Sequence, residues 1–161
     1  MEPRFNLFEN ELAAKFGKRF ANASLVITQS TLPKSTQELV SLRVSQINGC
    51  GWCVDIHTKD LAAAGESALR INLVAAWREA SVFTEAEQAA LALAEEGTRL
   101  ADASHGVSDE TWAQVRKHYD DDGIAALVAL VSLINAANRL AVIVHQKGGA
   151  YEPGMFAGLA S

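Results

Sequence analysis

From Ile124 to Val144 the chain is almost continuously apolar, and this run limits the folds that the rest can adopt. A helix of about 20 apolar residues either crosses a bilayer or lies in a protein core. Asn135, Asn138 and Arg139 interrupt the run, and an arginine near the centre of a membrane span costs roughly 2.5–3.5 kcal/mol. We therefore expect a buried helix with a polar stripe and no membrane partner. Buried amide and guanidinium groups need partners, so structural or interface contacts are the expected role of these three residues.

The spacing of apolar residues elsewhere also predicts helices. Near the N-terminus an apolar side chain recurs at every third or fourth position, as in an amphipathic helix. The residues of this pattern are Phe5, Phe8, Leu12, Phe16 and Phe20. A second broad apolar face follows Pro33 and ends at Asn48-Gly49, a pair typical of a helix stop followed by a tight turn.

Later helix starts are marked by capping residues. Thr84 and Glu87 have the spacing of a capping box, and Ser108 is placed to cap the helix that follows it. Glycine and proline residues predict a loose tail over residues 148–161. At 161 residues, with no linker, low-complexity tract or clear repeat, the chain suits a single domain over 1–161. We predict an all-α bundle of about six or seven helices.

The charge and the N-terminal segment limit the partners and the compartment. A formal net charge of -5 argues against a nucleic-acid binder, which would need a basic face to neutralise phosphates. Acidic residues interrupt the first sixteen positions and no apolar segment follows them, so we expect no signal peptide and a cytoplasmic protein. In that compartment a C-x-x-C motif is more often catalytic or metal-binding than a structural disulfide.

Cys50 and Cys53 form such a motif directly after the turn at Asn48-Gly49. If a helix begins there, Cys50, Cys53 and His57 lie on one face of it. The backbone N–H groups at the helix start stabilise a thiolate, which favours Cys50 as the more acidic thiol. The first turn can adjust enough for a reversible disulfide, and His57 is placed to exchange a proton with Cys53.

Other interpretations of the motif remain open at this stage. A structural zinc site would need four ligands, and the C-x-x-C-x-x-x-H pattern supplies three, with Glu38 or His105 as a possible fourth. The two cysteines can also be inert core residues. Glu38 has its own alternative, because its spacing from Ser35 is that of a capping box. Spacing alone also leaves Glu38 and His57 without a direct contact. We expect no metal and no cofactor.

Residues 38–65 read ELVSLRVSQINGCGWCVDIHTKDLAAAG, and this core motif closely resembles the alkylhydroperoxidase AhpD-like family. That family lies within the carboxymuconolactone decarboxylase-like superfamily. The combination of Glu38, the two cysteines and a histidine four positions after the second cysteine is specific. The similarity continues through AWRE at 76–79 and INAANRL at 134–140. It implies an AhpD-like helical bundle that assembles as homotrimers or homohexamers.

The resemblance also implies a reaction. Cys53 would attack a hydroperoxide and become a sulfenic acid, Cys50 would resolve it to a disulfide, and Glu38 and His57 would act as the proton relay. A thioredoxin-like or lipoyl-type protein would then reduce the disulfide. The best-studied members have a second histidine where this chain has Trp52, which implies a shorter relay here.

Three functions follow, in order of expectation. The first is a peroxidase-type antioxidant enzyme that reduces hydroperoxides. The second is a non-enzymatic thiol–disulfide redox sensor or binding protein. The third is a decarboxylase-like enzyme on the same scaffold, which the cysteine pair disfavours because the decarboxylases of the superfamily work without it.

Overall fold

A computed structural model describes residues 3–103 and 105–156 of the chain. The described residues form a single all-helical domain, as predicted, with seven α-helices and three short 3-10 helices. The α-helices are α1 (Glu11–Thr28), α2 (Lys34–Ile47), α3 (Gly51–Ala63), α4 (Ala68–Leu73), α5 (Glu85–Thr98), α6 (Asp109–His118) and α7 (Asp121–Ile143). The 3-10 helices are η1 (Leu7–Glu9), η2 (Val74–Glu79) and η3 (Leu100–Asp102).

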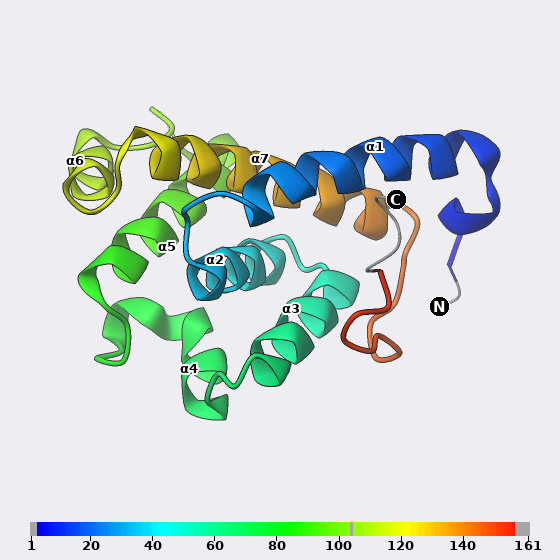
Figure 1. Cartoon of the computed structure of the whole chain (residues 1–161), viewed down its shortest axis with the longest axis horizontal. Coiled ribbons are helices and arrows are strands. Elements are labelled where there is room, and N and C mark those ends of the chain that lie inside the picture. Colours follow the sequence, from blue (N-terminus) through cyan, green and yellow to red (C-terminus); the bar gives the residue numbers. More distant parts are fainter. Residues whose placement is uncertain (1–2, 104, 157–161) are drawn as a thin grey trace.

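Helix α2 is the central element of the bundle. It packs against α3, α5 and α7, and it buries polar residues as well as apolar ones. Figure 1 shows α1 and α7 side by side along one edge of the molecule, with α2 and α3 beneath them. Buried side chains of α2, α5 and α7 form the main core, and a second core lies between α2, α3, η2 and α5. The hairpin of α2 and α3 therefore lies beneath the layer formed by α1 and α7.

Helix α7 is the long apolar helix that the sequence predicts. Within the described part of the chain it is the one helix long and apolar enough to cross a membrane. Its apolar side chains pack into the main core, with Leu127 fully buried and Ile124, Leu130 and Ile134 nearly so. Asn138, from the predicted polar stripe, is also fully buried and hydrogen-bonded. These contacts are those of a core helix.

The two predicted capping sites are confirmed, whereas the N-terminal helix α1 begins only at Glu11, although its apolar pattern starts at Phe5. Thr84 and Glu87 form a capping box at α5, and Ser108 caps α6. Residues 25–28, with the sequence LVIT, form the last turn of α1. The short helix α4 is followed directly by η2, within which Ala76 has non-helical backbone angles.

The C-terminal segment differs from the loose tail expected from its glycines and proline. Residues 148–156 lack regular secondary structure, but they lie against α3 and are held there by hydrogen bonds. Tyr151 in the middle of this segment is only 5% exposed. We call residues 148–156 the C-terminal strap. Residues 157–161, the remainder of the predicted tail, lie outside the described residues.

Candidate functional site

The site is built on the hairpin between α2 and α3. Helix α2 ends at Ile47, and Gly49 makes the turn with a φ of +66°, a conformation that glycine adopts at no steric cost. Cys50 is the N-cap of α3, and its Sγ accepts a hydrogen bond from the backbone N–H of Cys53 at 3.3 Å. The predicted helix start at the cysteine motif is therefore confirmed, with Cys50 capping α3 and Cys53 in its first turn.

Cys50 and Cys53 form a disulfide in the structure. Their Cα atoms are 5.4 Å apart, which is within the usual range for a disulfide. Both residues are almost completely buried, at 1% and 2% exposure. In the part of the chain that the structure describes, no group of three or more His, Cys, Asp or Glu side chains is arranged to hold a metal ion.

His57 and Glu38 are brought into direct contact. Nδ1 of His57 lies 2.7 Å from Oε2 of Glu38, a hydrogen bond between α3 and α2. We expected no direct contact between Glu38 and His57, and this expectation is wrong. The two helices form a hairpin that places the two residues opposite each other. The capping alternative for Glu38 is not seen either. Pro33 is the N-cap of α2 and the helix start has no side-chain cap.

A cavity of about 470 Å³ lies over this hairpin. Its lining is mainly apolar and comes from α1, α2, α3 and α7, with Phe16 and Phe20 contributed by α1. Cys53, His57 and Glu38 all line the cavity, whereas Cys50 does not. This volume is in the range of small-molecule sites, which typically combine apolar walls with a few polar groups. One of the two cysteines, Cys53, is therefore part of the wall of a mainly apolar cavity.

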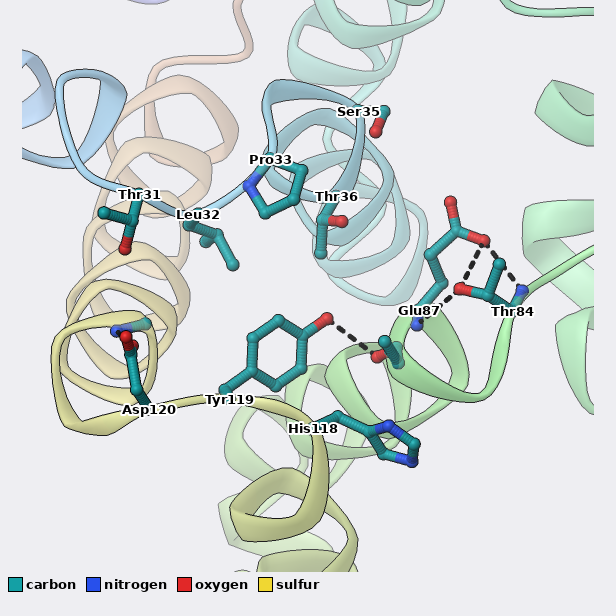
Figure 2. Close-up of a pocket in the computed structure, with 12 residues that line it drawn as sticks. Thr31, Leu32, Pro33, Ser35, Thr36, Thr84, Glu87, His118, Tyr119 and Asp120 are labelled. Carbon is teal, nitrogen blue, oxygen red and sulfur yellow. Dashed lines mark hydrogen bonds between the residues drawn. The ribbon is translucent and has the colours of Figure 1, made fainter.

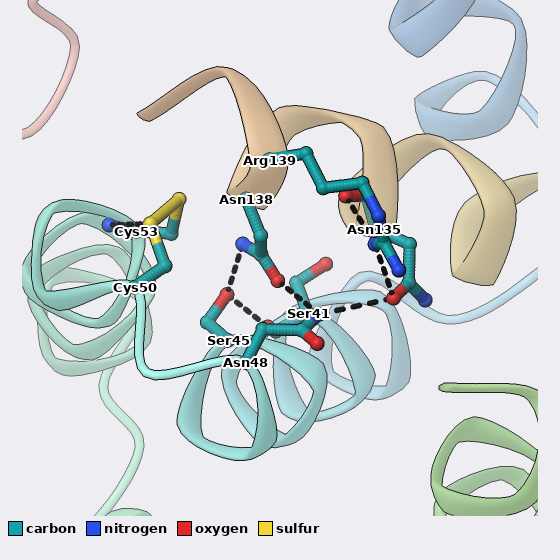
Figure 3. The surroundings of a disulfide bond; sticks show 8 residues. All are labelled: Ser41, Ser45, Asn48, Cys50, Cys53, Asn135, Asn138 and Arg139. Carbon is teal, nitrogen blue, oxygen red and sulfur yellow. Dashed lines mark hydrogen bonds between the residues drawn. A yellow bond between two sulfur atoms is a disulfide. The ribbon is translucent and has the colours of Figure 1, made fainter. Parts of the chain in front are cut away.

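The asparagines of α7 hold the turn that carries the cysteines (Figure 3). The side-chain amide of Asn48 donates to Oδ1 of Asn135 at 3.0 Å and to Oδ1 of Asn138 at 2.9 Å. Asn138 in turn donates to the hydroxyl of Ser45 at 3.0 Å. Arg139 is exposed and donates to the backbone and side-chain oxygens of Asn135. Within the chain these polar groups make structural contacts beside the disulfide.

Comparison with protein families places this geometry in a known context. Residues 14–96, which contain the hairpin and both cysteines, match the model of the carboxymuconolactone decarboxylase family. The chain belongs to that family. Its relative YdfG of Bacillus subtilis (strain 168), an uncharacterized protein, is 36% identical over 137 residues, covering 85% of this chain and 92% of YdfG.

Other family relatives are named for peroxide reduction. The alkyl hydroperoxide reductase AhpD of Rhodopseudomonas palustris (strain BisB18) is 44% identical over 75 residues. That alignment covers 44% of this chain and 41% of AhpD. Among solved structures, the protein of unknown function ATU0492 from Agrobacterium tumefaciens has a TM-score of 0.85 at 31% identity. The structural alignment covers 93% of this chain and 100% of ATU0492, which confirms the AhpD-like fold.

Asp60 and Tyr151 border the site of this family member and were not identified from the sequence. Asp60 lies one turn beyond His57 on α3, and the Tyr151 hydroxyl donates to its carboxylate at 2.9 Å and 3.1 Å. Burial raises the pKa of Asp60, and the negative charge of Glu38 adds to this effect. Burial and the bond to Asp60 raise the pKa of Tyr151 to about 12. Asp60 follows His57 by about one helical turn, so the sequence could have indicated that the two residues are neighbours on a helix. No sequence pattern links Asp60 to Tyr151.

A second cavity, of about 440 Å³, lies at the N-terminal end of α2 (Figure 2). The N-terminal ends of α2, α5 and α7 meet there. The hydroxyl of Tyr119 donates to the carbonyl of Ala86 at 2.8 Å, and Thr84 and Glu87 are engaged in the capping box of α5. None of the site residues predicted from the sequence lines this cavity.

Proposed function

We propose that this protein is a peroxidase that reduces hydroperoxides through reversible formation of the Cys50–Cys53 disulfide. The Cys53 thiolate attacks the terminal oxygen of the hydroperoxide and breaks the O–O bond. The alkoxide takes up a proton and leaves as an alcohol, and Cys53 becomes a sulfenic acid. The Cys50 thiolate then attacks the sulfur of Cys53, so that water leaves and the disulfide forms. A dithiol supplies the two electrons that restore both thiols.

One arrangement carries the proposal: a redox-active pair of cysteines with one member in the wall of a mainly apolar cavity. Cys53 lines that cavity together with His57 and Glu38, and Cys50 does not. This supports the assignment of Cys53 as the attacking thiol and Cys50 as the resolving one. The position of Cys50 at the helix start suits its role equally well, because the helix dipole stabilises the thiolate that attacks Cys53.

His57 and Glu38 are the proposed proton relay. His57 follows Cys53 by one helical turn and lies on the same face of α3, so it can take the thiol proton and give it to the leaving alkoxide. The carboxylate of Glu38, 2.7 Å from Nδ1, holds the imidazole in place through this hydrogen bond. Trp52, where the better-known relatives have a histidine, cannot carry a proton, so the proposed relay ends at His57.

The remaining partners follow from the same scheme. We propose a cytoplasmic homotrimer or homohexamer that is reduced by a thioredoxin-like or lipoyl-type protein. The mainly apolar lining of the cavity favours an organic hydroperoxide with a small apolar group. Neither nucleic acid nor a membrane is part of the proposed function.

The experiment is a steady-state assay of hydroperoxide consumption by the purified protein with a dithiol as reductant. We expect turnover by the wild-type chain and its loss in Cys53→Ser. In Cys50→Ser, we expect a single turnover that stops at the sulfenic acid, which can be trapped and weighed by mass spectrometry. Unchanged turnover in Cys53→Ser would contradict the proposal.

A second candidate function is a non-enzymatic redox sensor or binding protein. Both cysteines are nearly buried, and the C-terminal strap lies on the helix that carries them, so a change at the disulfide would alter the surface there. A disulfide that forms readily with mild oxidants, without catalytic consumption of peroxide, would identify this function instead.

A further inference from the structure

The C-terminal strap is fastened to the same helix that carries the cysteines. One carboxylate oxygen of Asp55 on α3 accepts hydrogen bonds from the backbone N–H groups of Gly149, at 2.7 Å, and Tyr151, at 3.1 Å. Lys59, one turn further along α3, pairs with Asp55 at 2.9 Å and donates to the carbonyl of Tyr151 at 2.7 Å. These hydrogen bonds lower the pKa of the Asp55 carboxyl, the bond from Lys59 most of all.

The strap begins in close contact with the cysteine motif. A Cβ atom at Gly148 would overlap the carbonyl oxygen of Gly51, the residue between Cys50 and Trp52, and would lie 3.0 Å from Cβ of Asp55. Only a glycine allows the two backbones to approach so closely. The strap is thus fixed at its start beside the first turn of α3.

Tyr151 fixes the middle of the C-terminal strap and contacts Phe156 at its end. Its side chain is buried, its hydroxyl donates to Asp60, and the same oxygen accepts from the N–H of Gly154 at 3.2 Å. Its ring stacks on that of Phe156, with the ring centres 5.5 Å apart. Tyr151 does not itself line the cavity over the hairpin, so it acts on the cavity through Phe156.

Phe156 closes the cavity beside the reactive cysteine. It lines the cavity together with Trp52 and Cys53, and its ring meets that of Trp52 edge to face with the centres 5.7 Å apart. Trp52 in turn packs against the two cysteines and Ala141. Two aromatic rings, one from α3 and one from the strap, therefore form the wall next to the sulfur that meets the substrate.

We propose that the C-terminal strap is the specificity-determining wall of this site, and that Phe156 limits the size of the group that reaches Cys53. Compact hydroperoxides would pass the Phe156–Trp52 wall, and hydroperoxides with a bulky aromatic or branched group would be disfavoured. Tyr151 is a positioning residue that keeps Phe156 in place. This inference rests on the proposed peroxidase function for its substrates, but the wall itself is testable without any peroxide.

The first test compares hydrogen peroxide with cumene hydroperoxide as substrates. Phe156→Ala should raise kcat/KM for the bulky substrate relative to the small one by about tenfold, the scale at which a hydrophobic pocket discriminates by size. Tyr151→Phe should shift the ratio in the same direction by a smaller factor. Met155→Ala, at an exposed neighbouring position of the strap, is the matched control and should leave the ratio unchanged. Phe156→Leu provides a milder variant should the alanine protein unfold.

The second test measures alkylation of Cys53 in a Cys50→Ser background, with iodoacetamide as the small probe and a pyrene maleimide as the bulky one. Phe156→Ala should increase the bulky-to-small ratio of rates by about tenfold, matching the pocket's size discrimination. If Phe156→Ala increases this ratio while the wild-type chain consumes no peroxide, the peroxidase is refuted but the wall is supported. A ratio unchanged by both Phe156→Ala and Phe156→Leu would overturn the inference, whatever the peroxidase activity.

Discussion

At the scale of single residues, the contact between Glu38 and His57 decides whether the site can move protons. The two residues are nineteen positions apart in the chain and meet through one short hydrogen bond between helices. Both are half-buried at the edge of the cavity, where water competes less with their interaction than at an open surface. A substitution of Glu38 that removes its charge but keeps its shape therefore tests the proton relay.

Glu38→Gln keeps an acceptor for His57 but removes the negative charge. We expect the rate of hydroperoxide consumption to fall by about 10²-fold, the lower range for loss of general acid–base catalysis. The assay is steady-state kcat/KM with a dithiol as reductant. Glu79→Gln, an exposed glutamate outside the cavity, is the control and should retain the wild-type rate. Equal rates in Glu38→Gln and wild type would remove Glu38 from the relay.

The sequence predicts part of this site and not the rest, for a physical reason. Cys50, Cys53 and His57 lie within two turns of a single helix, so helical geometry alone places them on one face. Glu38 lies on another helix, and its contact depends on how α2 and α3 fold back on each other. Local periodicity does not encode that packing angle, and the resemblance to a family supplied Glu38 where spacing could not.

Asn138 is the residue that ties α7 to the turn before the cysteines. It is fully buried, accepts from Asn48 and donates to Ser45. Asn138→Ala should lower the free energy of unfolding by about 2–3 kcal/mol, because it leaves buried polar groups without partners and opens a small cavity. Urea unfolding measures the loss. Arg139→Ala, the exposed neighbour, should change stability by less than about 0.5 kcal/mol. Similar losses in both variants would contradict this role of Asn138.

At the scale of elements, helices and the C-terminal strap differ in how far the sequence reveals them. The capping residues Thr84 and Ser108 mark helix starts because their effect is local. The strap has no periodic pattern, so its glycines and proline predict a loose segment. Its order comes from Asp55 and Asp60, charged residues on α3 that a sequence pattern assigns to solvent. Only the folded chain brings those carboxylates to the strap.

Gly148→Ala tests the contact between the start of the C-terminal strap and α3. The added methyl group would overlap the carbonyl of Gly51, so the strap must shift, at a cost of about 1–3 kcal/mol. We expect a lower unfolding midpoint and faster amide hydrogen exchange over residues 149–156. The matched control is Gly51→Ala on the opposite side of the same contact, where a methyl group meets open space and suits the helix. An unchanged exchange pattern in Gly148→Ala would show that the contact does not hold the strap.

At the scale of the whole molecule, Glu95 on α5 joins three elements. Its carboxylate accepts from Arg43 of α2 and from Trp77 and Arg78 of η2, with the Trp77 indole at 3.1 Å. Burial alone would raise the pKa of Glu95, but the hydrogen bonds from Arg43 and Trp77 outweigh burial and lower it below its ordinary value of 4.5. The charged form of Glu95 therefore stabilises the fold.

A lowered pKa in the folded state has a definite sign. The stability that Glu95 contributes is present above the pKa of the unfolded chain, near 4.5, and is lost as the pH falls through the lower folded value. Glu95→Gln should cost about 2 kcal/mol at pH 7 and unfold with a shallower dependence on pH below about 4.5. Urea unfolding between pH 2.5 and 7 measures both. Glu85→Gln, an exposed carboxylate on the same helix, should have a much smaller effect. A wild-type slope in Glu95→Gln would contradict this account.

The proposed assembly is argued from the apolar side chains that the single chain leaves on its surface. On α1, Leu12 is 77% exposed and Val26 is 72% exposed, and Ile143 at the end of α7 is 67% exposed. We propose that these side chains contribute to the interface of the assembly, because contiguous exposed apolar surface is typical of protein interfaces. Neither Leu12 nor Val26 lines the cavity over the hairpin, so a charge introduced there leaves the lining of the site in place.

We expect light scattering to give three or six times the chain mass of 17.2 kDa for the wild-type protein. Leu12→Glu combined with Val26→Glu should shift the protein to smaller species, because burying a carboxylate in an apolar interface costs several kcal/mol. Leu69→Glu, at a position 60% exposed on α4, is the control and should leave the mass unchanged. A monomeric wild-type protein would refute the assembly. A trimer or hexamer that tolerates both charges on α1 would place the interface on another face, and the exposed end of α7 would be the next surface to test.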